Sequence, residues 1–341
     1  MRHHLSIVSL LVVSATPCTL ASQGHAYHVA RRFAVPGDGF WDYLTIDTAS
    51  RRLYVTHGTR VQVLDVDRGT VIGEIPNTPG VHDVALAPEL GRGFTSNGRA
   101  ASVTIFDLKT LAIIGTVAVP GGNPDAIVYD SVSRRVFTFN GRSRTATAID
   151  AASGAVNGSL SLGGKPEFAV ADGAGRIYVD IEDRNELSVI DSRAFTLLDR
   201  WPLPGCEEPT ALALDRVHRR LFVGCGNERM VVVAAESGRV VATVPIGAGV
   251  DGVAFDPATQ LVFSSNGEGT LTVIAESRDS CRVVATVPTA RGARTLALDG
   301  RTHHVWVVTA ERTPPPPATE MNPNPRPGIV PGSFVVLEVS P

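Results

Sequence analysis

The chain has 341 residues, of which 43% are apolar and 19% charged, and its formal net charge is −3. This near-neutral balance excludes a broadly basic nucleic-acid-binding protein, because binding to phosphates requires clustered Lys and Arg. Apolar residues are plentiful and evenly spread, which excludes disorder for most of the chain. The low charge and the 33 glycines favour many short strands joined by tight turns.

The first residues predict a secretory signal peptide over residues 1–21. Arg2 supplies a positive charge, and an apolar run follows over residues 5–15. Ala21 completes a small-residue cleavage signal, and a later cut after Ala26 also fits. The apolar run is too short to span a bilayer, which takes about 20 residues. We therefore expect an exported protein, periplasmic or secreted, with no transmembrane segment in the mature chain.

The rest of the chain repeats one unit, in which a turn is followed by an apolar second strand. The turn recurs in steps of 41 to 43 residues, at Asp47, Pro88, Asp130, Asp172, Asp215, Asp256 and Asp299. A period of about 40 to 45 residues with four strands per unit is typical of a β-propeller blade. The sequence therefore predicts an all-β, seven-bladed propeller of four-stranded antiparallel blades, forming a single domain over residues 27–341.

The seventh unit is one strand short. Its third strand covers residues 334–339, and Pro341 ends the chain. Residues 28–36 have the pattern of a fourth strand, but no first three strands precede them. We expect this N-terminal strand to complete the last blade, which closes the ring and removes exposed sheet edges.

Several second strands carry a Tyr-Val-Thr-Asn-like sequence, at residues 54–57, 94–97 and 137–140 and more distantly at 263–266. With these motifs the chain resembles the YVTN-type β-propeller repeat family over nearly all of its mature length. The resemblance implies an exported bacterial seven-bladed propeller. It implies little about activity, because that family is mostly uncharacterised and relatives of this architecture include quinoprotein amine dehydrogenase subunits, lactonases and lyases.

The face that carries the loops between blades is the candidate functional face, and we call its central opening the channel mouth. Alignment of the repeats places one residue per blade at the start of the first strand: Asp42, Asp83, Asp125, Glu167, Thr210, Asp251 and Arg294. His57 and His82 lie near the same mouth in the first two blades. The binding candidates are therefore Asp42, His57, His82, Asp83, Asp125, Glu167, Asp251 and Arg294.

Five carboxylates around one opening support two chemical interpretations. They could hold a divalent cation through oxygen ligands, for which Asp42, Asp125, Glu167 and Asp251 are the candidates. They could also supply a general acid and a general base. The competing interpretation is structural, since an Asp repeated once per blade often bonds backbone amides at a turn. Arg294 and Lys165 interrupt the acidic ring and could pair with carboxylates or clamp an anionic ligand.

Three cysteines remain after signal cleavage. Cys206 and Cys225 are expected on the channel-mouth face, whereas Cys281 is expected on the opposite face. Cys206–Cys225 is therefore the candidate disulfide, worth about 3 kcal/mol if it is unstrained, and an unbridged pair is the alternative.

A proline-rich segment over residues 311–332 interrupts the last blade between its second and third strands. Prolines keep such a loop extended and semi-rigid. Because long loops in compact domains are often functional, we expect it to cover part of the mouth.

These observations favour a monomeric, non-enzymatic exported propeller that binds a small ligand or a protein partner at the channel mouth. One alternative is a metal-assisted hydrolase or lyase with lactonase-like chemistry in the acidic ring. Another is a structural, envelope-associated repeat protein. A divalent cation is the only cofactor that the residues suggest.

Overall fold

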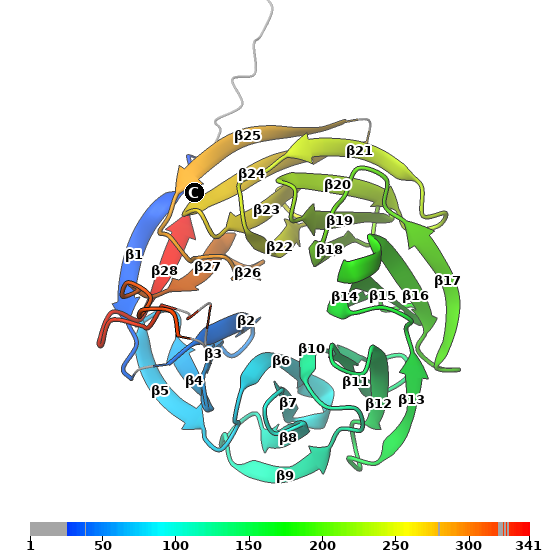
Figure 1. Ribbon diagram of the computed structural model, residues 1–341, viewed down its shortest axis with the longest axis horizontal. Helices are drawn as coiled ribbons and strands as arrows, with labels where there is room; N and C mark the ends of the chain where they lie inside the picture. The colour runs from blue at the N-terminus through cyan, green and yellow to red at the C-terminus, as the bar shows by residue number, and fades with distance from the viewer. Residues whose placement is uncertain (1–25, 38, 279, 320–322, 324, 326) are drawn as a thin grey trace, which may run out of the picture.

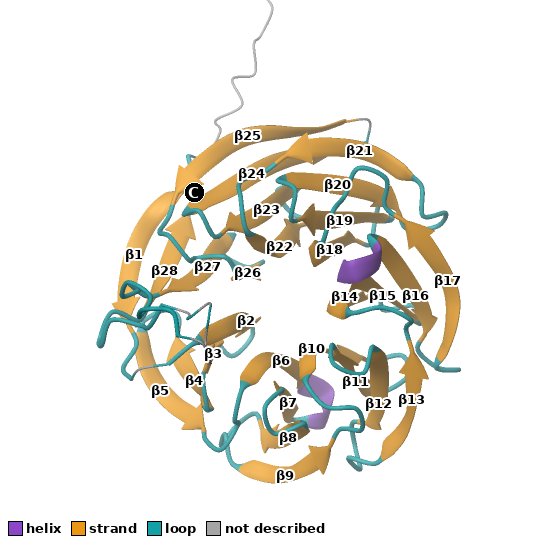
Figure 2. Ribbon diagram, in the orientation of Figure 1, coloured by secondary structure: helices purple, strands orange, loops and turns teal. Residues whose placement is uncertain are grey.

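The computed structural model describes residues 26–37, 39–278, 280–319, 323, 325 and 327–341; the expected signal segment, residues 1–21, lies outside them. The strands form seven four-stranded antiparallel sheets around a central opening (Figure 1), which confirms the predicted seven-bladed propeller. Two short 3-10 turns, η1 (Pro88–Leu90) and η2 (Glu182–Arg184), are the helical elements of the described residues (Figure 2). None of the described helical elements has the length and apolar character needed to cross a bilayer.

The first six blades each consist of four consecutive strands, from the channel outwards. Blade 1 contains β2 (Trp41–Asp47), β3 (Arg52–His57), β4 (Arg60–Asp65) and β5 (Thr70–Ile75). Blade 2 contains β6 (Val81–Ala87), β7 (Arg92–Asn97), β8 (Ser102–Asp107) and β9 (Ile113–Ala118). Blade 3 contains β10 (Pro124–Asp130), β11 (Arg135–Asn140), β12 (Thr145–Asp150) and β13 (Val156–Ser161). Blade 4 contains β14 (Pro166–Ala171), β15 (Arg176–Ile181), β16 (Glu186–Asp191) and β17 (Thr196–Pro202). Blade 5 contains β18 (Pro209–Asp215), β19 (Arg220–Cys225), β20 (Arg229–Ala234) and β21 (Val240–Pro245). Blade 6 contains β22 (Val250–Asp256), β23 (Leu261–Asn266), β24 (Thr270–Ser277) and β25 (Ser280–Pro288).

The seventh blade joins the two ends of the chain. It contains β26 (Leu296–Asp299), β27 (His304–Thr309), β28 (Val335–Ser340) and, as its outermost strand, β1 (His28–Ala34). β1 runs antiparallel to β28, from the pair His28 and Ser340 to the pair Ala34 and Val335. This confirms that the N-terminal strand closes the ring. The ladder stops shortly before Pro36, which has no N–H to donate.

Neighbouring blades are joined by an arginine at the start of the second strand. In four blades it donates to backbone carbonyls at the turn between the third and fourth strands of the next blade, from Arg52 to Leu108, Arg92 to Ala151, Arg135 to Arg193, and Arg220 to Ser277. Apolar side chains fill the space between blades, as where Tyr178 and Leu187 of blade 4 pack with Leu212 and Val231 of blade 5. The repeated arginine is therefore part of the scaffold.

Cys206 and Cys225 are joined by a disulfide, with their Cα atoms 5.3 Å apart. The bond links the loop that precedes β18 to the end of β19. Among the described residues Cys281, on β25, is the free cysteine, and it is partly buried.

Candidate functional site

A β-bulge at the start of the first strand turns one side chain per blade into the channel mouth. In six blades the register of the first strand against the second shifts directly after the first residue of the strand. A bulge leaves the extra residue outside the ladder and re-aims its side chain. The residues in this position, which we call the mouth ring, are Asp42, His82, Asp125, Glu167, Thr210 and Asp251, with Arg294 before β26 in the seventh blade.

In blade 2 the observed strand register assigns a different residue to the mouth ring than the sequence alignment did. Val81 pairs with Asn97 and Asp83 pairs with Ser96, so His82 is the bulged residue. His82 therefore belongs to the mouth ring, and Asp83 lies one layer deeper. There it is buried, and one of its oxygens accepts a hydrogen bond of 2.7 Å from the backbone N–H of Val84. The sequence alignment took Pro88 as the turn position of blade 2, whereas Ala87 pairs with Arg92 as Asp47 pairs with Arg52 in blade 1. The ring residue of blade 2 therefore lies one position earlier than the alignment placed it.

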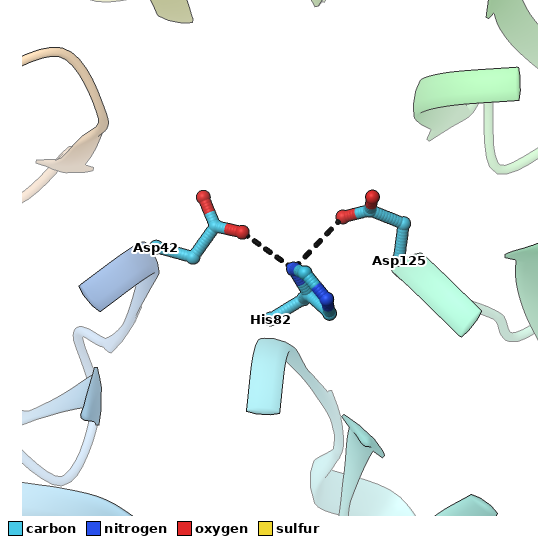
Figure 3. Close-up of side chains that lie close together, drawn as sticks. All are labelled: Asp42, His82 and Asp125. Carbon is cyan, nitrogen blue, oxygen red and sulfur yellow. Dashed lines mark hydrogen bonds and ion pairs between the residues drawn. The ribbon is translucent and has the colours of Figure 1, made fainter. Parts of the chain in front are cut away.

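His82 lies between two carboxylates of the mouth ring (Figure 3). Its Nδ1 atom is 2.6 Å from Oδ2 of Asp42 and 3.3 Å from Oδ1 of Asp125. Burial opposes the charged imidazolium, but the hydrogen bond to Asp42 and the charges of Asp125 and Asp42 outweigh it and raise the pKa of His82 to about 9. At neutral pH His82 is therefore a cation held between blades 1 and 3.

Arg294 makes a similar bridge on the other side of Asp42. Its guanidinium nitrogens lie 3.4 Å from Oδ1 of Asp42 and 2.9 Å from Oδ2 of Asp251. The other oxygen of Asp251 accepts a 2.9 Å hydrogen bond from the hydroxyl of Thr210. Five members of the mouth ring thus form a row of alternating charge, in the order Asp251, Arg294, Asp42, His82, Asp125.

Lys165 neutralises the remaining carboxylate of the ring. Its Nζ atom lies 3.0 Å from Oε2 of Glu167 and also contacts Glu182 at the start of η2. One ammonium thus serves two carboxylates. Lys165, Arg294 and His82 each bridge two acids, so carboxylates outnumber cations in this part of the mouth.

This shortage of positive charge appears in the titration of the carboxyl groups. Burial is the largest cause in each case. It raises the pKa of Asp125 to about 6, that of Asp251 to about 7 and that of Glu167 to about 8. Neighbouring carboxylates add to the effect, Asp42 on Asp125 and Asp251, and Asp125 on Glu167. These groups therefore titrate around neutral pH, where acid-base chemistry and cation binding are both accessible.

Two aromatic side chains lie next to the mouth ring, one residue further along their strands. The rings of Tyr43 in blade 1 and Phe168 in blade 4 contact each other across the channel, with centroids 4.9 Å apart. The register places them in one layer with small residues from other blades, such as Ala126 and Gly252. Burial, followed by the charges of Asp251 and the other mouth carboxylates, raises the pKa of Tyr43 well above its usual value. The two rings thus narrow the channel between blades 1 and 4.

On the side of blades 4 to 7 the mouth opens into a cavity of about 1050 Å³, which we call the cup. Its lining mixes acidic side chains (Glu167, Glu182, Glu208, Asp251 and Glu311) with basic ones (Arg32, Arg291, Arg294 and Arg312). A cavity of about 350 Å³, lined mainly by apolar residues, lies around the other side of the aromatic layer.

The base of the proline-rich loop contributes to the wall of the cup. Arg312 forms a bridge with Ile329, and its guanidinium lies 5.6 Å from the centre of the Trp41 ring. In Figure 1 the described part of this loop, in orange to red, lies over the last and first blades at the side of the mouth. Residues 320–322, 324 and 326 of the loop are outside the described part of the chain.

His57 lies apart from the ring. It ends β3, is 1% exposed, and stacks on Phe334 with centroids 4.0 Å apart. Its Nδ1 is 2.6 Å from Oε1 of Gln62. The residues at the same strand position in blades 2, 3 and 6, Asn97, Asn140 and Asn266, bond hydroxyl groups within their own blades. The residue at this position therefore stabilises its own blade and does not belong to the mouth ring.

The four residues considered for a cation do not converge on one point. Asp42 and Asp125 come together with His82, and one ligand atom of each lies within 4.8 Å of the others. Glu167 and Asp251 are instead paired with Lys165 and Arg294. Tyr43 and Phe168, which contact each other across the channel, were not among the sequence candidates. Only their meeting across the channel distinguishes them from ordinary core residues.

The fold and the cup define this chain as a seven-bladed β-propeller with an acidic channel mouth. No protein-family model matches the chain, and no curated protein matches its sequence. Its fold is similar to that of a chain in the crystal structure of the mitotic checkpoint complex (TM-score 0.75, 14% identity, 99% of each chain covered). It is also similar to U3-55K (TM-score 0.75, 10% identity, 91% of this chain and 99% of the other covered). At such identities the similarity shows the fold alone.

Proposed function

We propose that this protein binds a small ligand carrying a cationic group, such as a primary amine, in the cup at the channel mouth. The observation that carries this proposal is the cup itself. Glu167 and Asp251 line its wall, and burial together with neighbouring carboxylates raises the pKa of both to near neutral pH. An ammonium group in the cup would let Glu167 and Asp251 ionise.

Calorimetric titration with putrescine tests this proposal, with 1,4-butanediol as an uncharged probe of similar length. We expect heat and saturation with putrescine only. Glu167→Gln and Asp251→Asn should each weaken putrescine binding at least about tenfold, because one charge contact of this kind contributes about 1.4 kcal/mol or more. Glu74→Gln, a change of an exposed residue on outer strand β5, is the matched control and should bind normally. The amine site would be ruled out if the wild type did not bind putrescine, or if both cup variants bound putrescine as tightly as the wild type.

A second candidate function is a metal-assisted hydrolase or lyase, as in lactonases. The convergence of Asp42, His82 and Asp125 favours it. Hydrolysis of γ-butyrolactone, followed with and without added Ca²⁺ and in Asp125→Asn, tests this candidate. Activity that requires both Ca²⁺ and Asp125 would support it, and activity equal to that of the buffer would exclude it for this substrate.

We also propose that the chain is an exported member of the YVTN-type propeller family and acts as a monomer. The repeated second-strand motif and the Cys206–Cys225 disulfide support export, since disulfides persist in oxidising compartments. Cell fractionation with N-terminal sequencing of the mature protein tests it. A mature N-terminus near Ser22 or Tyr27 is expected, and a cytoplasmic chain that still begins at Met1 would contradict it.

Protein partners are the alternative occupants of the mouth face. Propellers of this shape occur in assemblies such as the mitotic checkpoint complex. A cup of about 1050 Å³ fits a small molecule better than the flat face of a protein. We therefore favour the small ligand.

A further inference from the structure

A second group of polar side chains lies at the junction of blades 5 and 6, on the face opposite the mouth. Asp215 ends β18, His218 lies in the turn before β19, and Glu276 lies near the end of β24 in the next blade. One ligand atom of each residue lies within 4.8 Å of the others. Nδ1 of His218 is 2.6 Å from Oδ2 of Asp215.

His218 departs from the repeat at its position in the turn. In blades 1, 6 and 7 the same position holds a hydroxyl residue that bonds the Asp at the end of the first strand. The bonds run from Ser50 to Asp47 (2.7 Å), from Thr259 to Asp256 (2.8 Å) and from Thr302 to Asp299 (2.8 Å). A serine or threonine therefore suffices for the turn, and the imidazole is not required by the fold.

Glu276 departs from the repeat more strongly. Its position is defined by a backbone hydrogen bond to the turn before the second strand, which Glu276 makes to Gln260. The residues that make the equivalent bond in blades 1 to 5 are Val66, Leu108, Ala151, Ser192 and Ala235, none of them charged. The fold thus uses a small or apolar side chain here, and blade 6 alone of these six places a carboxylate there.

The carboxylate of Glu276 is only half satisfied. Oε1 accepts a hydrogen bond of 3.0 Å from Arg220, whereas Oε2 is buried without a hydrogen-bond partner in the described part of the chain. The side chains of Glu276 and Asp215 are 0% and 1% exposed. Burying a carboxylate is costly unless a cation and hydrogen bonds compensate both of its oxygens, and Oε2 of Glu276 has no such hydrogen bond among the described residues.

We propose that Asp215, His218 and Glu276 form a binding site for a divalent transition-metal ion, with Zn²⁺ as the best fit. One imidazole and two carboxylates are a ligand set that Zn²⁺ accepts, and the imidazole favours it over Ca²⁺ and Mg²⁺. The ion satisfies the open oxygen of Glu276 and clamps the turn of blade 5 to β24 of blade 6. This site is independent of the cup.

Thermal unfolding of the purified, EDTA-treated full chain with ZnCl₂ or MgCl₂ tests the site. We expect Zn²⁺ at saturation to raise Tm by about 3 °C or more, as ligand linkage requires, and Mg²⁺ to leave it unchanged. His218→Ser and Glu276→Ala install residues that the repeat itself uses at these positions. Both variants should therefore fold, and both should lose the Zn²⁺ response.

Two controls separate this site from other zinc-binding groups. His303→Ala removes a His–Asp pair, with Nδ1 2.7 Å from Oδ2 of Asp256, for which the described residues supply no third ligand, and His82→Ala removes the histidine of the mouth ring. Both variants should keep the Zn²⁺ response. No response in the wild type, or a response lost in a control and kept in Glu276→Ala, would overturn the proposal.

Discussion

Single residues give the channel mouth its chemistry through an imbalance of charge. His82, Arg294 and Lys165 each bridge two carboxylates, so the carboxylates are only partly compensated. The arrangement gathers Asp42 and Asp125 around His82, whereas Glu167 and Asp251 lie apart from them, beside Lys165 and Arg294. It leaves Glu167 and Asp251 as the groups most able to accept an added cation, because both hold protons near neutral pH.

A pH dependence follows from these two groups. Their pKa values of about 8 and about 7 lie above those of free carboxyl groups, so a bound cation must displace protons below these values. Putrescine affinity should rise as the pH increases from 6 to 8 and then level off. Calorimetry at pH 6, 7 and 8 checks this, and Glu167→Gln should flatten the upper half of the profile. Affinity independent of pH in the wild type would contradict the assignment.

The buried carboxyl group of Asp180 has no hydrogen bond in the described part of the chain to offset the cost of its burial. It lies fully buried on β15, and neither carboxyl oxygen has a hydrogen-bond partner in the described part of the chain. Burial, and next the charge of Glu167, raise the pKa of Asp180 well above its usual value. Other blades place Thr56, Ser96 or Ser265 at this position, where the hydroxyl donates to a backbone carbonyl.

Asp180→Ser should therefore stabilise the protein. A carboxyl whose pKa is raised by folding contributes stability at low pH, and that stability is lost as the pH rises from the unfolded value of 3.8 through the folded value. The gain should be small at pH 4 and reach about 1–3 kcal/mol at pH 8. Urea unfolding at both pH values measures it, with exposed Glu236→Ser as the control. A variant less stable than the wild type at pH 8 would show that Asp180 has a role that the fold does not explain.

At the scale of elements, polar ladders inside the blades hold the second strand to the third. The side-chain amide of Asn140 donates to the hydroxyls of Thr145 and Thr147, and its carbonyl accepts from Thr138. Asn97 and Asn266 repeat the pattern in blades 2 and 6. The asparagine of the Tyr-Val-Thr-Asn-like motif is therefore a structural residue that satisfies buried hydroxyl groups.

Asn140→Ala should lower the free energy of unfolding by about 1–3 kcal/mol, because three hydroxyl groups, two of them buried, lose a partner. Chemical denaturation measures the loss. Putrescine binding should be unchanged, since Asn140 is buried and lies outside the cup lining. A large loss of binding with little loss of stability would instead assign Asn140 to the site.

At the scale of the whole molecule, the ring depends on β1. This strand supplies the outer edge of blade 7, and Phe33 stacks on Trp306 of β27 with centroids 5.8 Å apart. Val35, 2% exposed, joins the core between blades 7 and 1. Because a propeller is closed, its first and last blades contact each other as all other pairs do.

A circular permutant tests whether closure needs the natural chain ends. The register pairs His28 with Ser340, so a short turn can join the end of β28 to the start of β1. A permutant that begins at Gly39 and carries residues 27–36 after Ser340 should fold, with a Tm within several degrees of the wild type. A chain lacking residues 27–36 altogether should lose the cooperative transition, because an open edge and an uncovered core remain. Both are followed by circular dichroism, and equal stability of the truncated chain would contradict the role of β1.

The sequence by itself determined the architecture of this protein. A nearly constant period and seven turn positions specify seven blades. A single extra strand at the N-terminus and a last unit that is one strand short specify how the ring closes. These features are local patterns repeated along the chain, so they can be recognised without knowing which residues are neighbours in the folded protein.

The site depended on contacts that only the tertiary structure decides. A one-residue bulge determines that His82, and not Asp83, faces the mouth, because neighbouring residues of a strand point to opposite sides. Tyr43 and Phe168 meet across the channel although blades 2 and 3 separate them in sequence. His218 and Glu276, which belong to different blades, become neighbours only when the blades pack. Burial and packing in the folded ring, which no repeat pattern records, give these residues their chemistry.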